Sequence, residues 1–425
     1  MPTKQQLSWM LYDWASSPVP TLHATFVFSV YFTTQIMPDG GSFYWSQMVG
    51  VTALLLGISA PFLGRMADRR GWIKHSLFAG TCGGALTTAL LWFAAPDISW
   101  AGFALLCSAL SIFCVEIAFV FYNALLPVLV PKHLTGRLSA QGWGLGYFGA
   151  IIALIMVLWL FILPETPLFF ADTDEMEPVR FSMVFAALWL VIFSLPLFIF
   201  CKNPPASAQL SNSRSEHPAD TGFIADTYAA FRRACQIPGM IRFLLSRMAF
   251  NDGLITLFAF GGIYAAQIFS FTQTQILVFA IGLNITAGIG AFISATLHQR
   301  YDSLQIIRIS LISLIILGGI CIWAPTPAIF WGAGLCLGVC IGPCQSAARV
   351  HLAQLAPPDD RASLFGLFML SGKLTSFVGP LCYGWLVWGF GTDRAGMMIV
   401  ILLLMLGLIL LPAGTPQQTP EHSPD

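Results

Sequence analysis

The chain has 425 residues, of which 56 % are hydrophobic and only 9 % are charged, whereas soluble domains carry roughly 25 % charged residues. Its twenty basic and twenty acidic side chains cancel, so no net field attracts a nucleic acid, and we expect no nucleic-acid binding. So few charges cannot cover the surface of a soluble protein of this size. The composition therefore predicts an integral membrane protein surrounded largely by lipid.

Long uncharged runs predict how the chain crosses the membrane. Residues 253–297 and 309–348 contain no Asp, Glu, Lys or Arg, and each run is long enough for two helices of about 20 residues. The runs lack the two-residue alternation of barrel strands, which favours an all-α protein. Breaks at Pro, Gly and charge clusters predict twelve transmembrane helices, at 9–37, 43–64, 75–95, 99–130, 139–163, 180–201, 241–270, 274–297, 303–323, 328–355, 362–388 and 395–412.

The distribution of Lys and Arg predicts the orientation. With a cytoplasmic N-terminus, fifteen of the twenty Lys and Arg residues fall in or beside cytoplasmic segments, whereas only Arg180 and Arg394 fall in outer loops. Both termini are therefore expected in the cytoplasm. The first apolar segment contains Asp13, Pro18 and Pro20, which is not the pattern of a cleavable signal. Short loops and no targeting peptide fit a bacterial inner membrane.

A polar stretch divides the chain into two predicted halves. Residues 202–222 are rich in Pro and Ser. We expect a six-helix half at 1–201, a linker with an amphipathic surface helix at 202–240, a second six-helix half at 241–413, and a tail at 414–425. The stretch RLSAQG at 137–142 is echoed by RASLFG at 361–366. Two such halves around a central cavity are typical of a rocking secondary transporter, here expected to be monomeric.

Six ionisable residues fall inside predicted spans. A charge facing lipid at a helix centre costs about 2.5–3.5 kcal/mol on insertion scales, so these residues are expected to face a cavity or to pair. The carboxylates are Asp13, Glu116 and Asp252, and the cations are Arg247, Arg349 and Lys373. Glu116, Asp252 and Lys373 are expected near mid-depth. Asp13, Arg247 and Arg349 lie nearer the cytoplasm, where they are candidate gate residues.

Polar side chains extend from these charges at helical spacing. Asn123 shares a helix face with Glu116, Asn251 with Arg247, and Gln345 with Arg349. One hypothesis is that Glu116 or Asp252 exchanges a proton while Lys373 or an Arg holds a substrate carboxylate. The alternative is a static ion-pair network that locks the helices together. The predicted substrate and proton site comprises Asp13, Glu116, Asn123, Asn251, Asp252, Gln345 and Lys373.

The loop between the second and third spans carries a recognisable signature. It reads GRMADRRGWIK at residues 64–74 and resembles the cytoplasmic motif of the major facilitator superfamily. The resemblance implies that Asp68 and Arg69, between Gly64 and Gly71, stabilise one gate state. Alternatively, the cations only fix the topology.

Other groups of residues indicate a metal site or a proton relay less clearly. Cys336, Cys340 and Cys344 line one helix face, but nearby glycines favour close helix packing instead of a metal path, and no metal or cofactor is expected. His23 is either a proton relay or a packing residue. No Walker loop, Ser-His-Asp order or zinc signature is present in the sequence, so neither an ATP-driven pump nor an enzyme is predicted.

Several segments resemble the Atg22-like vacuolar effluxers and their bacterial relatives. They are LYDWA at 11–15, FYNALLP at 121–127, GWGLGY at 142–147, NDG at 251–253, FAFGGIY at 258–264 and SGK at 371–373. The resemblance implies export of an amino-acid-like zwitterion, and the intramembrane carboxylates make protons the expected coupling ion. Two alternatives stay open: an exporter of amphipathic molecules and a non-transporting sensor. The prolines after Ser16 depart from the usual pattern and predict a kinked or unwound turn.

Overall fold

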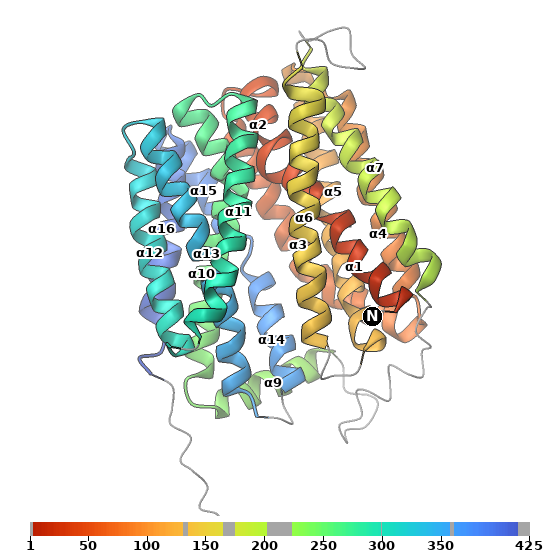
Figure 1. Cartoon of the computed structure of the whole chain (residues 1–425), viewed down its shortest axis with the longest axis vertical. Helices are drawn as coiled ribbons and strands as arrows, with labels where there is room; N and C mark the ends of the chain where they lie inside the picture. The colour runs from red at the N-terminus through yellow and green to blue at the C-terminus, as the bar shows by residue number, and fades with distance from the viewer. Residues whose placement is uncertain are drawn as a thin grey trace, which may run out of the picture.

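The computed structural model describes residues 3–130, 135–164, 175–201, 223–298, 300–357 and 361–414, and these residues form helices and connecting turns without a strand. Inside the helices a few side chains, including those of Asp68 and Arg69, lie outside the described part. The polar stretch 202–222 and nearly all of the predicted tail also lie outside it. The helices stand side by side as one elongated bundle (Figure 1).

The described residues of the first half form seven α-helices and several shorter 3₁₀ and π segments. In Figure 1 it occupies the right-hand side of the bundle. The α-helices are α1 (Lys4–Ser16), α2 (Phe28–Tyr31), α3 (Gly41–Arg70), α4 (Ile73–Leu90), α5 (Ala101–Leu129), α6 (Thr135–Val157) and α7 (Glu177–Phe200). The shorter segments are η1 (Pro20–Phe26), η2 (Phe32–Ile36), η3 (Leu91–Phe93), η4 (Ile98–Trp100) and η6 (Leu158–Ile162).

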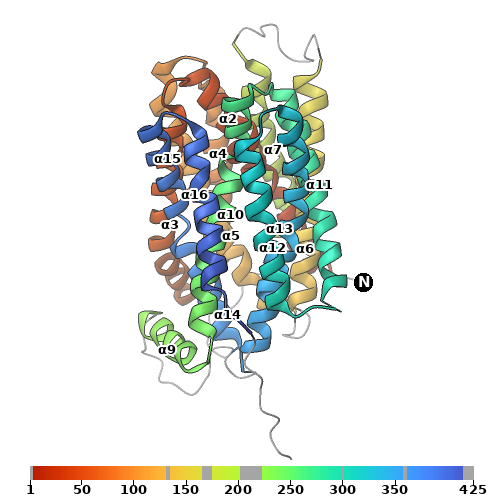
Figure 2. The same cartoon turned by 90° about the vertical axis from the view of Figure 1, so that its left-hand side faces the viewer.

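The second half occupies the left-hand side of Figure 1, and α9 lies across the lower end of the bundle in both views (Figures 1 and 2). Its elements are α9 (Phe223–Gln236), α10 (Met240–Phe269), α11 (Gln273–Leu297), α12 (Ser303–Trp323), α13 (Pro327–Leu355), α14 (Arg361–Leu374), α15 (Val378–Phe390) and α16 (Asp393–Leu410). We call the lower end the α9 end and the opposite end the far end. The expected topology places the α9 end in the cytoplasm.

Ten helices within the described residues are long and apolar enough to cross a membrane. The other two predicted spans, the first and the eleventh, coincide with interrupted helices. In the first, α1 ends at Ser16 and a π-helix begins at Pro20, because Pro18 and Pro20 have no N–H to continue the α-helical ladder. In the eleventh, α14 ends at Leu374 and α15 begins at Val378. The structure is thus consistent with twelve crossings.

Hydrogen bonds join the two halves at the far end. Nε2 of Gln267 on α10 donates to the carbonyl of Thr33 at 2.7 Å, and Nε2 of Gln273 donates to the carbonyl of Phe26 at 3.2 Å. These bonds attach α10 and the start of α11 to the π segments of the first span, whose backbone carbonyls are available as acceptors. The two halves therefore meet tightly at the far end.

Candidate transport site

An ion pair connects the halves near the middle of the bundle. Nζ of Lys373, next to the end of α14, lies 2.5 Å from Oε2 of Glu116, halfway along α5. The Lys373 side chain is 47 % exposed and that of Glu116 is 37 % exposed. Because lipid would penalise exposed charges at this depth, we infer that both face a water-accessible space between the halves. The structure thus brings together two of the predicted mid-depth charges.

Asp252, the third predicted mid-depth charge, lies apart from this pair. Its side chain is buried, and Oδ2 accepts a hydrogen bond from the backbone N–H of Gly379 at 3.0 Å. Gly379 is the second residue of α15, so the carboxylate sits at the positive N-terminus of that half-helix. The other oxygen, Oδ1, is buried and has no hydrogen-bond partner among the described residues. Asp252 therefore caps one side of the break in the eleventh span.

Two further polar residues of α10 hold the other side of that break. Nη1 of Arg247 donates to the carbonyl of Phe368 at 2.7 Å, and its guanidinium carbon lies 3.5 Å from the centroid of the Phe368 ring. Nδ2 of Asn251 donates to the carbonyl of Gly372 at 3.3 Å. The predicted stripe of Arg247 and Asn251 thus faces α14. Together with Asp252, it ties α10 to both halves of the interrupted helix.

Asp13 lies in a separate network inside the first half. Its Oδ2 accepts a hydrogen bond from the hydroxyl of Tyr122 at 2.7 Å. The Tyr122 ring stacks on Trp9, with centroids 4.4 Å apart, and Nε1 of Trp9 donates to the carbonyl of Tyr122 at 3.1 Å. A Cβ at Gly142 of α6 would lie 2.5 Å from Oδ2 of Asp13, so a larger residue there would displace the carboxylate. Asp13 joins α1, α5 and α6, and within the described residues it makes no hydrogen bond or ion pair with the Glu116–Lys373 pair.

The remaining predicted site residues are dispersed. Nδ2 of Asn123 donates to the carbonyl of Phe119 on its own helix at 2.8 Å. Nε of Arg349 approaches the backbone carbonyl of Gln345 at 3.4 Å, while its guanidinium carbon lies 5.2 Å from the centroid of the Trp143 ring. Because Trp143 belongs to α6, Arg349 contacts the opposite half of the molecule.

The signature segment at the α9 end is more helical than its sequence predicts. The second span is expected to end at Gly64, yet α3 continues through Asp68 and Arg69 to Arg70. The chain then turns at Gly71, where φ is +66°, a conformation that favours glycine. The side chains of Asp68 and Arg69 lie outside the described residues. The guanidinium of Arg70 stacks on Trp72, with its central carbon 4.8 Å from the ring centroid.

The sequence interpretation missed two features and left a third open. The hydroxyl of Tyr383 donates to Asp393 at 2.5 Å at the far end, and both side chains are buried. Trp143 lies beside Arg349, and the ring of Tyr147 lies next to that of Trp143; both belong to the GWGLGY segment, but an aromatic residue alone does not indicate its partner. His23 was left open, and its Nε2 lies 2.9 Å from Oγ of Ser108 in a buried site, which favours packing.

Solved structures with the same arrangement of helices are membrane transporters. A point mutant of the nucleoside transporter NupG aligns with a TM-score of 0.71 and 15 % identity, covering 96 % of this chain and 98 % of that chain. A D-xylose-proton symporter aligns with a TM-score of 0.70 and 11 % identity, with the same coverage. The MFS-type transporter YxiO of Bacillus subtilis is 24 % identical over 98 % of this chain and 96 % of its own length. The protein is therefore an integral membrane transporter with the major facilitator fold.

The family can be stated more narrowly. A sequence profile of the family described as "Vacuole effluxer Atg22 like" matches residues 28–417. Autophagy-related protein 22-1 of Penicillium rubens is 25 % identical over 302 residues, which are 66 % of this chain and 49 % of that protein. The chain spans about half the length of such fungal relatives. It belongs to the Atg22-like vacuole effluxer family, as the sequence segments quoted above predict.

Proposed function

We propose that this transporter moves a small polar or zwitterionic solute resembling an amino acid by alternating access. The observation that carries the proposal is the ion pair between Glu116 and Lys373. It offers a carboxylate and an ammonium side by side at mid-depth. A zwitterion carries the same two groups, so it can satisfy both partners at once.

The position of the pair gives binding a mechanical consequence. Glu116 belongs to α5 of one half and Lys373 to α14 of the other, so the pair is a direct link between the halves. A solute whose carboxylate binds Lys373 and whose ammonium binds Glu116 replaces this link without leaving either charge uncompensated. The exchange of one partner for another then shifts the equilibrium between conformations.

Asp252 is our proposed proton-coupling residue. It has no cationic partner among the described residues, and its Oδ1 has no hydrogen-bond donor there. Protonation removes the negative charge that faces the N-terminus of α15 and so weakens the interaction. Asn251 and Arg247 hold α14 on the other side of the break. Protonation of Asp252 would therefore also affect α14, the helix that carries Lys373.

The gate, the orientation in the membrane and the direction of transport are proposed from the sequence and the family. Gly64, Asp68, Arg69 and Gly71 are proposed to form a gate at the α9 end, with Arg247 and Arg349 above it. The excess of basic residues at that end supports a cytoplasmic position for both termini, and the proposal includes export across a bacterial inner membrane by a monomer.

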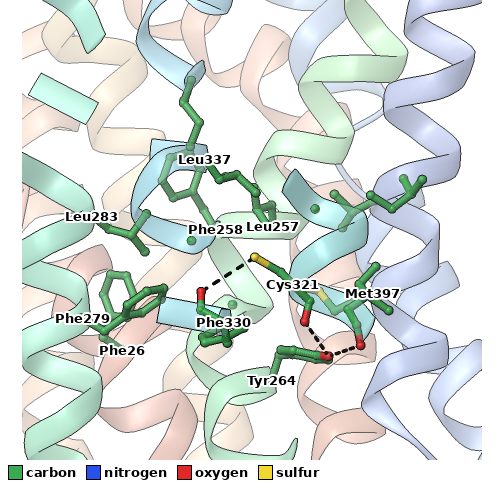
Figure 3. Close-up of a pocket in the computed structure, with 17 residues that line it drawn as sticks. Phe26, Leu257, Phe258, Tyr264, Phe279, Leu283, Cys321, Phe330, Leu337 and Met397 are labelled. Atoms are coloured by element: carbon green, nitrogen blue, oxygen red, sulfur yellow. Dashed lines mark hydrogen bonds between the residues drawn. The ribbon is translucent and has the colours of Figure 1, made fainter. Parts of the chain in front are cut away.

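A second candidate function, export of amphipathic molecules, is favoured by a pocket in the second half (Figure 3). It is a small cavity of about 60 Å³ between α10, α11, α12, α13 and α16, with Phe26 of the first half at its edge. Its lining is apolar, and the only side-chain hydroxyl among the lining residues, that of Tyr264, donates to the carbonyls of Cys321 and Ile322. Such a pocket suits a hydrocarbon group.

Reconstituted vesicles distinguish the two candidates. Vesicles loaded with the twenty amino acids are followed by mass spectrometry, with and without an imposed pH gradient. We expect selective movement that depends on the gradient and is lost in Glu116→Gln. No movement above that of protein-free vesicles contradicts amino-acid transport, and amphipathic compounds are then tested in the same vesicles.

A further inference from the structure

The six intramembrane charges do not face the space between the halves equally. Asp13 and Asp252 are only 4 % and 1 % exposed. Arg349 and Lys373 are exposed, and Arg247 and Glu116 are partly buried. A solute arriving between the halves therefore meets three cations, Arg247, Arg349 and Lys373. Of the three carboxylates among these six charges, only Glu116 is accessible. The excess of positive charge lies on the second half.

Arg349 is the most available of these cations. Its one hydrogen bond within the described residues is the long contact from Nε to the carbonyl of Gln345, and it forms no ion pair there. Its guanidinium carbon lies 5.2 Å from the centroid of the Trp143 ring, and the ring of Tyr147, one helical turn further along α6, lies next to Trp143 with ring centroids 6.4 Å apart. Arg349 thus presents unused donors beside two aromatic rings from the opposite half.

Arg247 adds a second cation nearby. It is anchored to α14 through the carbonyl of Phe368 and lies flat on the Phe368 ring. α10 packs against α13, and Arg247 and Arg349 lie at a similar depth on these two helices. Neither forms an ion pair with a described residue. Two cations on neighbouring helices that have no counter-charge among the described residues cost free energy, and a bound anion would recover that free energy.

We propose that Arg247 and Arg349, covered by Trp143 and Tyr147, bind an anionic group, a carboxylate or a phosphate, on a solute that enters from the α9 end. Both arginines lie within about two helical turns of that end. A guanidinium is suited to this role because its donors form a planar fork that matches both anions. The inference rests on the proposed transport of a small solute and deepens it, because the favoured substrate then carries a net negative charge.

Binding to the purified full-length protein tests the inference without requiring transport. Isothermal titration calorimetry at constant ionic strength would use glutamate, its neutral counterpart glutamine, and inorganic phosphate. We expect glutamate or phosphate to bind, and glutamine to bind at least tenfold more weakly than the better anion. Binding of glutamate alone identifies a carboxylate site, and binding of phosphate alone identifies a phosphate site. Absence of binding by both anions overturns the proposal, as does equal binding of glutamine.

Variants assign the binding to the two arginines. Arg349→Gln and Arg247→Gln should each weaken anion binding at least tenfold, since a hydrogen bond to a charged group contributes about that factor. Arg349→Lys should recover part of the loss. Arg300→Gln, which changes an exposed cation between α11 and α12, is the matched control and should bind as the wild type does.

Arg349 is exposed, so its variant remains informative even if Arg247→Gln does not fold. Wild-type affinity in Arg349→Gln, or equal loss in Arg300→Gln, overturns the assignment. The binding measurement involves no gradient. Its result would therefore be unchanged if Asp252 did not couple transport to protons, or if a solute did not replace the ion pair between Glu116 and Lys373.

Discussion

The carboxylate of Asp252 accepts a hydrogen bond from the backbone N–H of Gly379 at 3.0 Å. A side chain of α10, the seventh predicted span, thus caps α15, the second part of the interrupted eleventh span. Thr256, one turn further along α10, faces the same glycine, and a Cβ at Gly379 would overlap its hydroxyl. The interrupted helix is therefore held at its break by α10. A change of charge at Asp252 acts directly on this contact.

Asp252→Asn should separate proton coupling from solute exchange. The amide oxygen can still accept from Gly379, but the side chain no longer binds and releases a proton. We expect accumulation driven by a pH gradient to fall at least tenfold, while exchange of labelled for unlabelled solute in the absence of a gradient stays within about threefold of wild type. Asp97→Asn, at an exposed turn where Asp97 accepts from the N–H of Ser99, is the control. Wild-type accumulation by Asp252→Asn would exclude Asp252 as the coupling residue.

Removal of the hydrogen bonds at the far end should open that end. Gln267→Ala combined with Gln273→Ala deletes two bonds between the halves, together about 1–3 kcal/mol. A cysteine introduced at Ser46, which is buried on α3, should then react with a water-soluble maleimide at least about fivefold faster in detergent. Gln141→Ala, an exposed position on α6, serves as the control. An unchanged rate would mean that these bonds do not hold the end closed.

Two glycines of α6 should respond differently to alanine. A Cβ at Gly149 would lie 2.7 Å from the carbonyl oxygen of Trp14 on α1, whereas one at Gly144 would meet nothing within 4 Å. Gly149→Ala should therefore push α1 and α6 apart and cost about 1–3 kcal/mol of stability. Thermal unfolding in detergent should show a lower midpoint for Gly149→Ala and no decrease for Gly144→Ala. Equal midpoints would contradict the packing of α1 on α6.

Tyr122→Phe tests whether Asp13 is a structural residue. Loss of the hydroxyl removes the donor to the buried Asp13 carboxylate, at a cost of about 1–3 kcal/mol. We expect a lower midpoint of thermal unfolding but near wild-type transport per folded molecule. Tyr44→Phe changes an exposed ring and should alter neither quantity. A transport defect in Tyr122→Phe without loss of stability would instead place Asp13 in the transport cycle.

The membrane architecture was predictable because composition alone decides it. Uncharged runs such as 309–348 can only be buried or face lipid, so the helices follow from hydropathy. The break at Ser16–Pro20 was also predictable, since proline cannot continue the α-helical ladder. The break between α14 and α15 was not, because no proline precedes Val378 in that span and Asp252, which caps α15, is more than a hundred residues away.

The partners of the charges were harder to predict than their depth. Spacing along a helix correctly places Arg247 with Asn251 on one face, but it cannot indicate which helix they meet. For the same reason Lys373 was expected near mid-depth without a named partner. The pairing of Glu116 with Lys373, and the approach of Arg349 to Trp143, depend on contacts between the two halves.

A charge exchange at the central ion pair tests the account most directly. Glu116→Lys and Lys373→Glu place like charges opposite each other, and each should lower amino-acid transport in reconstituted vesicles at least tenfold. The double variant restores opposite charges between α5 and α14, so it should recover several-fold activity over either single variant. Single variants that transport at the wild-type rate, or a double variant no more active than the singles, would contradict the proposal that this pair links binding to movement of the halves.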